Sequence, residues 1–77
     1  MIKLCNFKTS VYNYKGSLGN YSKKQLLNAM SPTQRLILED IEWIGRRHPR
    51  KSEFVEIYVD PEIFPKNKLL LAQIVFG

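Results

Sequence analysis

The chain has 77 residues, one cysteine, a net charge of +5 and 44% apolar residues. This length provides for one domain over residues 1–77, and a chain so short buries only about 60% of the surface that it exposes when unfolded. A single Cys5 excludes an intrachain disulfide, and without clusters of Cys and His a structural zinc site is not expected. The chain therefore depends on its own apolar core or on one that it shares with a partner.

Three elements are expected in the amino-terminal half. Residues 1–8 mix apolar side chains with lysine and predict a first strand. Residues 9–20 are rich in Ser, Asn, Gly, Tyr and Lys, which is typical of a loop, with a short second strand expected over 11–14. A helix is predicted over 23–30, after an N-cap at Ser22.

The second helix is predicted from Pro32 to about Arg47. The segment Ser31–Gln34 provides a capping box, with the proline at the first helical position. Isoleucines then recur with helical spacing, and charged side chains fill the opposite face. Gly45 and Pro49 are expected to end this helix.

Two further strands are predicted to complete the fold. Residues 53–60 place Val55, Ile57 and Val59 on one face. Residues 69–76 are apolar on both faces, which is typical of a central strand. The prediction is therefore a small α+β domain in the order β(β)αββ, an antiparallel sheet of three or four strands packed by one long amphipathic helix.

Charge is distributed unevenly along the chain. Residues 1–38 contain six basic residues and no acidic one, residues 39–62 contain all seven acids and four basic residues, and two lysines follow. Segments of opposite sign indicate a basic surface for a polyanion and a second surface of different character. The same distribution also arises when acids pack against bases within a fold, so both interpretations stand at this point.

The acid-free segment repeats an Asn-aromatic pair at residues 6, 13 and 20, with lysines between the pairs. Aromatic rings stack on unpaired bases while lysines neutralise phosphates, so this composition is typical of single-stranded nucleic-acid binding. Alternatively, the tyrosines cover a thin core. The candidate binding residues in this part of the chain are Lys8, Tyr12, Tyr14, Lys15, Tyr21, Lys23 and Lys24.

A second basic cluster lies at the predicted end of the long helix. Its four cations fall within six residues and are expected to contact phosphate or an acidic protein surface. Alternatively, they stabilise the helix C-terminus, for which one cation suffices. His48 has no partner for catalysis in the sequence and is expected to be a solvated loop residue. The candidate residues of this cluster are Arg46, Arg47, Arg50 and Lys51.

The sequence does not predict an enzyme, a cofactor or a metal site. Asp60 and Glu62 are the only acidic pair at a strand end, and no nuclease lysine follows them. Gly16 and Gly19 lack the strand and helix that flank a phosphate-binding loop. Cys5 is expected to be a small buried side chain. The free thiol, the short apolar runs and the absence of an export signal predict a cytoplasmic location, in a cell or an infected cell.

Two functions follow from these observations. The first is a non-enzymatic protein that binds nucleic acid or a nucleoprotein complex through a cationic, tyrosine-containing surface. The second is a small inhibitor or adaptor that docks on a single host protein. In its size and lack of motifs the chain resembles phage-encoded inhibitors of host enzymes or defence complexes, such as anti-CRISPR proteins. Membrane binding is not expected, and the thin core is compatible with a homodimer.

Overall fold

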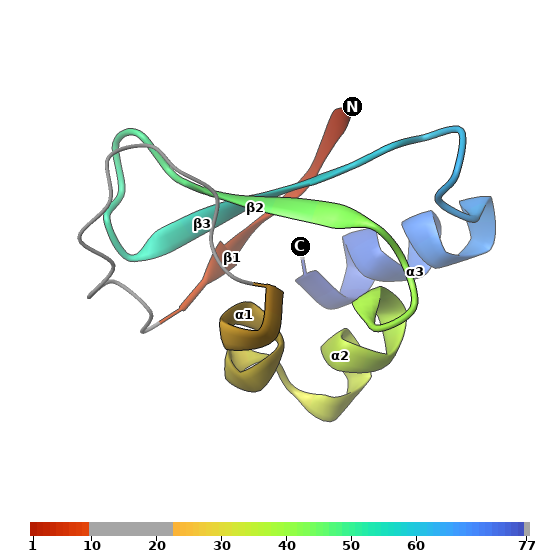
Figure 1. Ribbon diagram of the computed structural model, residues 1–77, viewed down its shortest axis with the longest axis horizontal. Coiled ribbons are helices and arrows are strands. Elements are labelled where there is room, and N and C mark those ends of the chain that lie inside the picture. The colour runs from red at the N-terminus through yellow and green to blue at the C-terminus, as the bar shows by residue number, and fades with distance from the viewer. Residues whose placement is uncertain (10–22, 77) are drawn as a thin grey trace.

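The strands and helices of the computed structural model follow the order βααββα over the residues that the structure describes, 1–9 and 23–76. The elements are β1 (Ile2–Lys8), α1 (Lys23–Ala29), α2 (Pro32–Leu38), β2 (Trp43–Arg47), β3 (Phe54–Val59) and α3 (Lys66–Phe76). The strands form an antiparallel sheet in the order β1-β3-β2. Figure 1 shows the helices on one side of this sheet. The α+β class is therefore confirmed, and the helix predicted over 23–30 is present as α1. The sheet is packed by three short helices and not by one long helix. The strand expected over 11–14 lies outside the described residues.

The central strand β3 shows which side of the sheet packs against the helices. Every second residue is buried, with 1% exposure or less: these are Val55, Ile57 and Val59. The residues that alternate with them, Phe54, Glu56 and Tyr58, are half-buried. Because neighbouring residues of a strand point to opposite sides, the first set forms the covered face of the sheet and the second lies on its open face. The prediction of a strand with this alternation is confirmed.

The start of α2 is also as the sequence predicts. The Ser31 hydroxyl accepts a 3.3 Å hydrogen bond from the backbone N–H of Gln34, and the Gln34 Oε1 accepts a 3.0 Å bond from the N–H of Ser31. These reciprocal bonds satisfy backbone donors that a helix start leaves without partners. Pro32, which has no N–H, follows at the first helical position.

The end of α2 differs from the prediction, because the helix stops at Leu38 and does not continue to Arg47. The Trp43 indole N–H donates a 2.9 Å hydrogen bond to the carbonyl of Leu38, a group that has no partner within the helix because it lies at the helix end. Residues 43–47 then pair with β3 as the strand β2. Trp and Ile favour strands, and pairing with β3 outweighs the helical spacing of the isoleucines.

Gly45, which was expected to end the long helix, lies in the middle of β2. A Cβ atom at this position would collide with the Leu26 side chain of α1 and would lie 3.3 Å from a methyl group of Val55. The glycine therefore serves close packing of α1 against the sheet rather than helix termination.

The predicted last strand over 69–76 is wrong, because these residues form most of α3. The segment is apolar at nearly every position, so it shows neither a strand nor a helix period, and its Leu, Ala and Gln residues favour a helix. Ala72 is fully buried, and the rings of Phe76 and Phe7 meet edge-on with centroids 5.9 Å apart. The helix thereby packs on β1. No helix in the described part of the chain is long and apolar enough to cross a membrane.

Candidate nucleic-acid interface

The open face of the sheet consists of three rows of side chains that run across the strands. The register of the three strands defines each row. The first row is Lys3, Tyr58 and Ile44, the second is Asn6, Glu56 and Arg46, and the third is Lys8 and Phe54. Lysines therefore lie along β1, two aromatic rings and a carboxylate along β3, and an arginine on β2. In the described structure the helices pack on the covered face, so these side chains are not beneath a helix (Figure 1).

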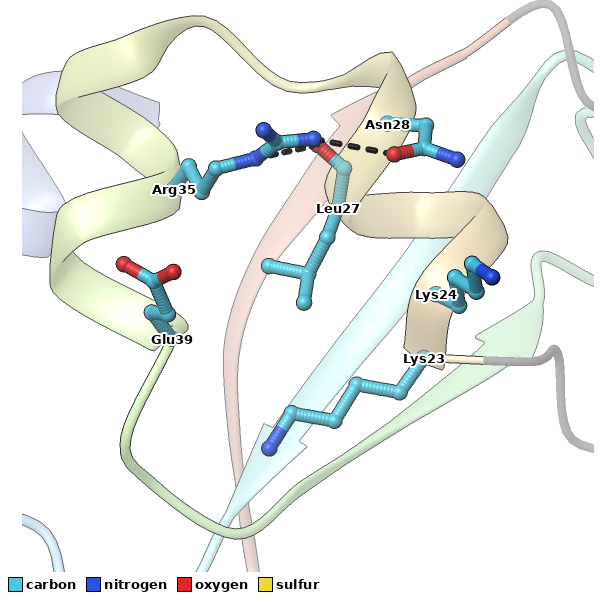
Figure 2. A pocket seen from close by; sticks show the side chains of 6 residues that line it. All are labelled: Lys23, Lys24, Leu27, Asn28, Arg35 and Glu39. Carbon is cyan, nitrogen blue, oxygen red and sulfur yellow. Dashed lines mark hydrogen bonds between the residues drawn. The ribbon is translucent and has the colours of Figure 1, made fainter.

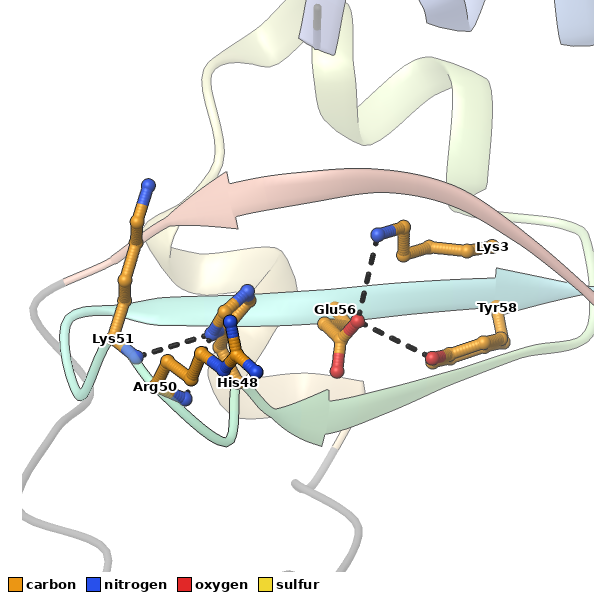
Figure 3. A network of polar contacts seen from close by, with 6 residues as sticks. All are labelled: Lys3, His48, Arg50, Lys51, Glu56 and Tyr58. Carbon is orange, nitrogen blue, oxygen red and sulfur yellow. Dashed lines mark hydrogen bonds and ion pairs between the residues drawn. The ribbon is translucent and has the colours of Figure 1, made fainter.

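Glu56 lies at the centre of a polar network on this face (Figure 3). Its Oε2 accepts a 3.3 Å hydrogen bond from the Tyr58 hydroxyl and lies 3.6 Å from the Nζ of Lys3. The Glu56 side chain is 14% exposed and that of Lys3 is 46% exposed. A pair so close to solvent adds little stability. The two contacts place Oε2 between the tyrosine hydroxyl and the lysine ammonium.

A cation lies over each aromatic ring of β3. The Arg46 guanidinium is 5.3 Å from the centroid of the Tyr58 ring, and the Lys51 Nζ is 5.3 Å from that of Phe54. Such contacts contribute about 0.5–1 kcal/mol each at exposed sites. They place a positive charge beside a flat apolar surface at two points of the open face.

The β2–β3 turn, residues 48–53, is organised by His48 (Figure 3). Its Nδ1 accepts backbone hydrogen bonds from Arg50 at 3.1 Å and from Lys51 at 3.0 Å. These two bonds tie the backbone of residues 50 and 51 to the imidazole ring. His48 was expected to be a solvated loop residue. In the structure it is half-buried, and its ring positions the backbone of two candidate cations, Arg50 and Lys51.

A shallow hollow of about 210 Å³ lies beside this turn. It provides space for roughly seven water molecules at their share of liquid volume, enough for one planar heterocycle. The hollow combines two guanidinium groups, one carboxylate and one aromatic ring. Its lining residues are Arg46, Arg47, Pro49, Glu56 and Tyr58.

The structure brings part of the predicted binding set together. On the open face or in the turn beside it lie Lys8, Arg46, Arg50 and Lys51. Arg47 pairs with Val55 at the end of β2 and lines the hollow. The cluster lies on a strand and a turn, so its interpretation as a helix C-terminus is wrong. The candidates outside the described residues are Tyr12, Tyr14, Lys15 and Tyr21.

The sequence did not identify the open-face residues of β3 as candidates, although its alternation already placed them on one face. The residues missed in this way are Phe54, Glu56 and Tyr58, and on β1 also Lys3 and Asn6. The pattern that could have identified those on β3 is the outer face of the strand, which is aromatic and charged, whereas an ordinary solvent-exposed face is uniformly polar. What the strand pattern did not show is that the helices leave that face open.

Lys23 and Lys24 lie apart from the open face, in a hollow of about 460 Å³ between α1 and α2 (Figure 2). The Lys23 Nζ donates a 3.0 Å hydrogen bond to the carbonyl of Ile41 and lies 6.0 Å from the centroid of the Trp43 ring. In the same hollow Arg35 donates hydrogen bonds of 3.2 and 3.0 Å to the carbonyl of Leu27, at the end of α1. These cations satisfy carbonyls at chain turns, so the contacts of Lys23 are structural.

Cys5 lies in β1, where it pairs with Ile57 of β3. Cys5 is half-buried against the core, and this burial raises the pKa of its thiol to about 12, so the thiol is protonated at neutral pH. Among the described residues no three His, Cys, Asp or Glu side chains lie together in a way that could hold a metal ion. Comparison with protein-family models, with curated proteins and with solved structures gives no match for this chain.

Proposed function

We propose that this protein is a non-enzymatic binder of single-stranded nucleic acid, alone or within a nucleoprotein complex, and that it binds through the open face of the sheet and the β2–β3 turn. The observation that supports this proposal best is the pair of cation-covered rings on β3, Tyr58 with Arg46 and Phe54 with Lys51. Single strands expose the flat faces of their bases and their phosphates together, and these are the groups that such pairs accommodate.

The spacing of the rings supports a single strand as the ligand. Phe54 and Tyr58 are four residues apart on one strand, about 13 Å at 3.3 Å per residue, so they contact different bases. Stacking contributes about 1–3 kcal/mol per base and is available only where bases are unpaired. A duplex keeps its bases stacked on one another and presents its edges and phosphates instead.

The charge around the rings has the sign that phosphates require. The described open face and turn carry five cations and two acids, namely Lys3, Lys8, Arg46, Arg50 and Lys51 against Glu53 and Glu56. Lysine and arginine at such a surface displace condensed counterions from the nucleic acid, which makes binding steeply dependent on salt.

A separate observation favours the second function, docking on a protein. Leu70, Leu71 and Ile74 of α3 are 65, 47 and 80% exposed. By helical spacing Leu70 and Ile74 lie opposite the buried Ala72, and Leu71 lies at the flank. An exposed apolar stripe of this kind marks a contact surface. It lies on the helical side of the sheet, so a protein bound there leaves the open face accessible.

Two variants of equal charge test the main proposal. Arg50→Ala/Lys51→Ala removes two cations from the turn, whereas Lys66→Ala/Lys68→Ala removes two from the start of α3, at the opposite end of the molecule (Figure 1). Binding to a labelled mixed-sequence single strand of about 12 nucleotides is measured by fluorescence anisotropy between about 50 and 200 mM salt.

We expect the turn variant to bind about tenfold more weakly, which is a loss of about 1.4 kcal/mol of binding free energy. The α3 variant should lose less than half of that binding free energy. The plot of log affinity against log salt should also become shallower by about 1.4 in the turn variant, since about 0.7 is lost for each phosphate contact to a single strand. Undetectable binding at low salt would end the proposal. Equal losses in the two variants would show attraction by net charge without a defined surface.

A further inference from the structure

Glu56 presents a hydrogen-bond acceptor in the hollow beside the turn. Both of its contacts within the described chain go to Oε2, from the Tyr58 hydroxyl and from Lys3. Figure 3 shows the second carboxylate oxygen pointing away from both partners. A carboxylate accepts about four hydrogen bonds, so the oxygen Oε1 and part of the capacity of Oε2 are not used. The network therefore holds in place a carboxylate that can still accept.

A carboxylate on a phosphate-binding surface repels the backbone of the ligand, so its partner there is a group that donates hydrogen bonds. Its best partner is a pair of parallel N–H donors on neighbouring atoms. An arginine from a protein has such a pair, but Arg46 and Arg47 line the same hollow and repel another cation. The hollow therefore favours an uncharged donor pair.

Among the bases, guanine has this donor pair on its Watson–Crick edge, at N1–H and the N2 amino group. Adenine and cytosine each place an acceptor nitrogen beside their amino group, and uracil and thymine place carbonyls on both sides of their single N–H. Guanine also carries O6 and N7, the acceptors that an arginine fork binds in a bidentate manner. The carboxylate of Glu56 and the guanidinium groups beside it thus match both edges of guanine.

We infer that the hollow lined by Arg46, Arg47, Glu56 and Tyr58 takes a guanine base of the bound single strand, with Glu56 accepting from N1–H and N2–H. This inference rests on the proposed function and adds a base preference to it. Arg46 and Tyr58 provide the flat surface for the base, and Arg47 lies beside them to bind its O6 and N7 edge. Glu56 is then a specificity-determining residue rather than only part of an internal ion pair.

The test compares strands of about 12 thymidylates that carry one central guanine, adenine or hypoxanthine. Hypoxanthine keeps N1–H and lacks the N2 amino group, so it removes one of the two donors. We expect the guanine strand to bind about tenfold more tightly than the adenine strand, with hypoxanthine between them. An equal affinity for the three strands overturns the inference and leaves the proposed function standing, whereas no binding of any strand at low salt overturns both.

The variant Glu56→Gln keeps the shape of the side chain but turns one acceptor into a donor. We expect its guanine-to-adenine ratio to fall below about twofold, even where overall affinity rises with the loss of a negative charge. Glu62→Gln removes the same charge at an exposed position outside the open face and the turn and should keep the tenfold ratio, which separates base recognition from charge. A preserved ratio in Glu56→Gln overturns the inference. If guanosine monophosphate binds as tightly as the guanine strand, the hollow is a site for a free nucleotide. That result overturns the inference that the guanine belongs to a bound strand.

Discussion

The covered face and the open face of the sheet are built from alternate residues of the same central strand, yet they differ in every physical respect. The covered residues of β3 are aliphatic, are 1% exposed or less and belong to one core cluster with buried residues of the helices. The open residues are aromatic or charged, are half-buried and contact cations. The difference shows how a short chain separates its tasks: one face supplies the free energy of folding, and the other is free to carry a ligand.

The largest effect that tests this separation comes from Ile57, which is fully buried on the covered face. We expect Ile57→Ala to lower the free energy of unfolding by about 2–5 kcal/mol, since it removes buried methyl groups and leaves a cavity. Glu56→Ala, at the neighbouring position on the open face, should cost less than about 1 kcal/mol. Urea unfolding measures both, and similar costs for the two variants would contradict the separation of the faces.

A smaller loss is expected at Gly45, where α1 meets the covered face. Gly45→Ala places a methyl group against the Leu26 side chain, and we expect it to cost about 1–3 kcal/mol of stability. Leu26→Ala provides room for that methyl group, so the double variant should lose less than the two single variants together. Strictly additive losses in thermal or urea unfolding would show that this contact does not limit the packing.

The smallest effect concerns the turn beside the open face. His48→Ala removes the acceptor of two backbone hydrogen bonds, and we expect a loss of about 0.5–1 kcal/mol in affinity for a single strand as the turn cations lose their fixed positions. His48→Asn keeps an acceptor at a similar place, as in turns capped by asparagine, and should retain most of the affinity. If both variants bind as the parent chain does, the turn does not depend on His48.

The parts of the fold that local chemistry determines could be predicted from the sequence. The capping box at Ser31 and the alternation of Val55, Ile57 and Val59 each depend on neighbours within a few residues. The segments over 43–47 and 69–76 depend on what they pack against. β2 is a strand because β3 provides its partner. Residues 69–76 of α3 are apolar at every position but one, so this segment shows no clear helical or strand period.

The same distinction applies to the candidate site. Arg46, Arg50 and Lys51 could be identified because cations crowd within a few residues of sequence. Glu56 could not, because its meaning depends on Lys3, which the sheet order β1-β3-β2 brings to it from the other end of the chain. A surface to which all three strands contribute side chains can be identified only when the register of the three strands is known.

The measurement that tests the central claim most directly is an amide chemical-shift titration of the isotope-labelled protein with a guanine-containing single strand. We predict that the largest shift changes fall on Asn6, Arg46 and Tyr58 and on the β2–β3 turn, while residues 70–74 of α3 change little. Changes centred on α3, with the open face unaffected, would contradict the account and would assign binding to the apolar helix instead.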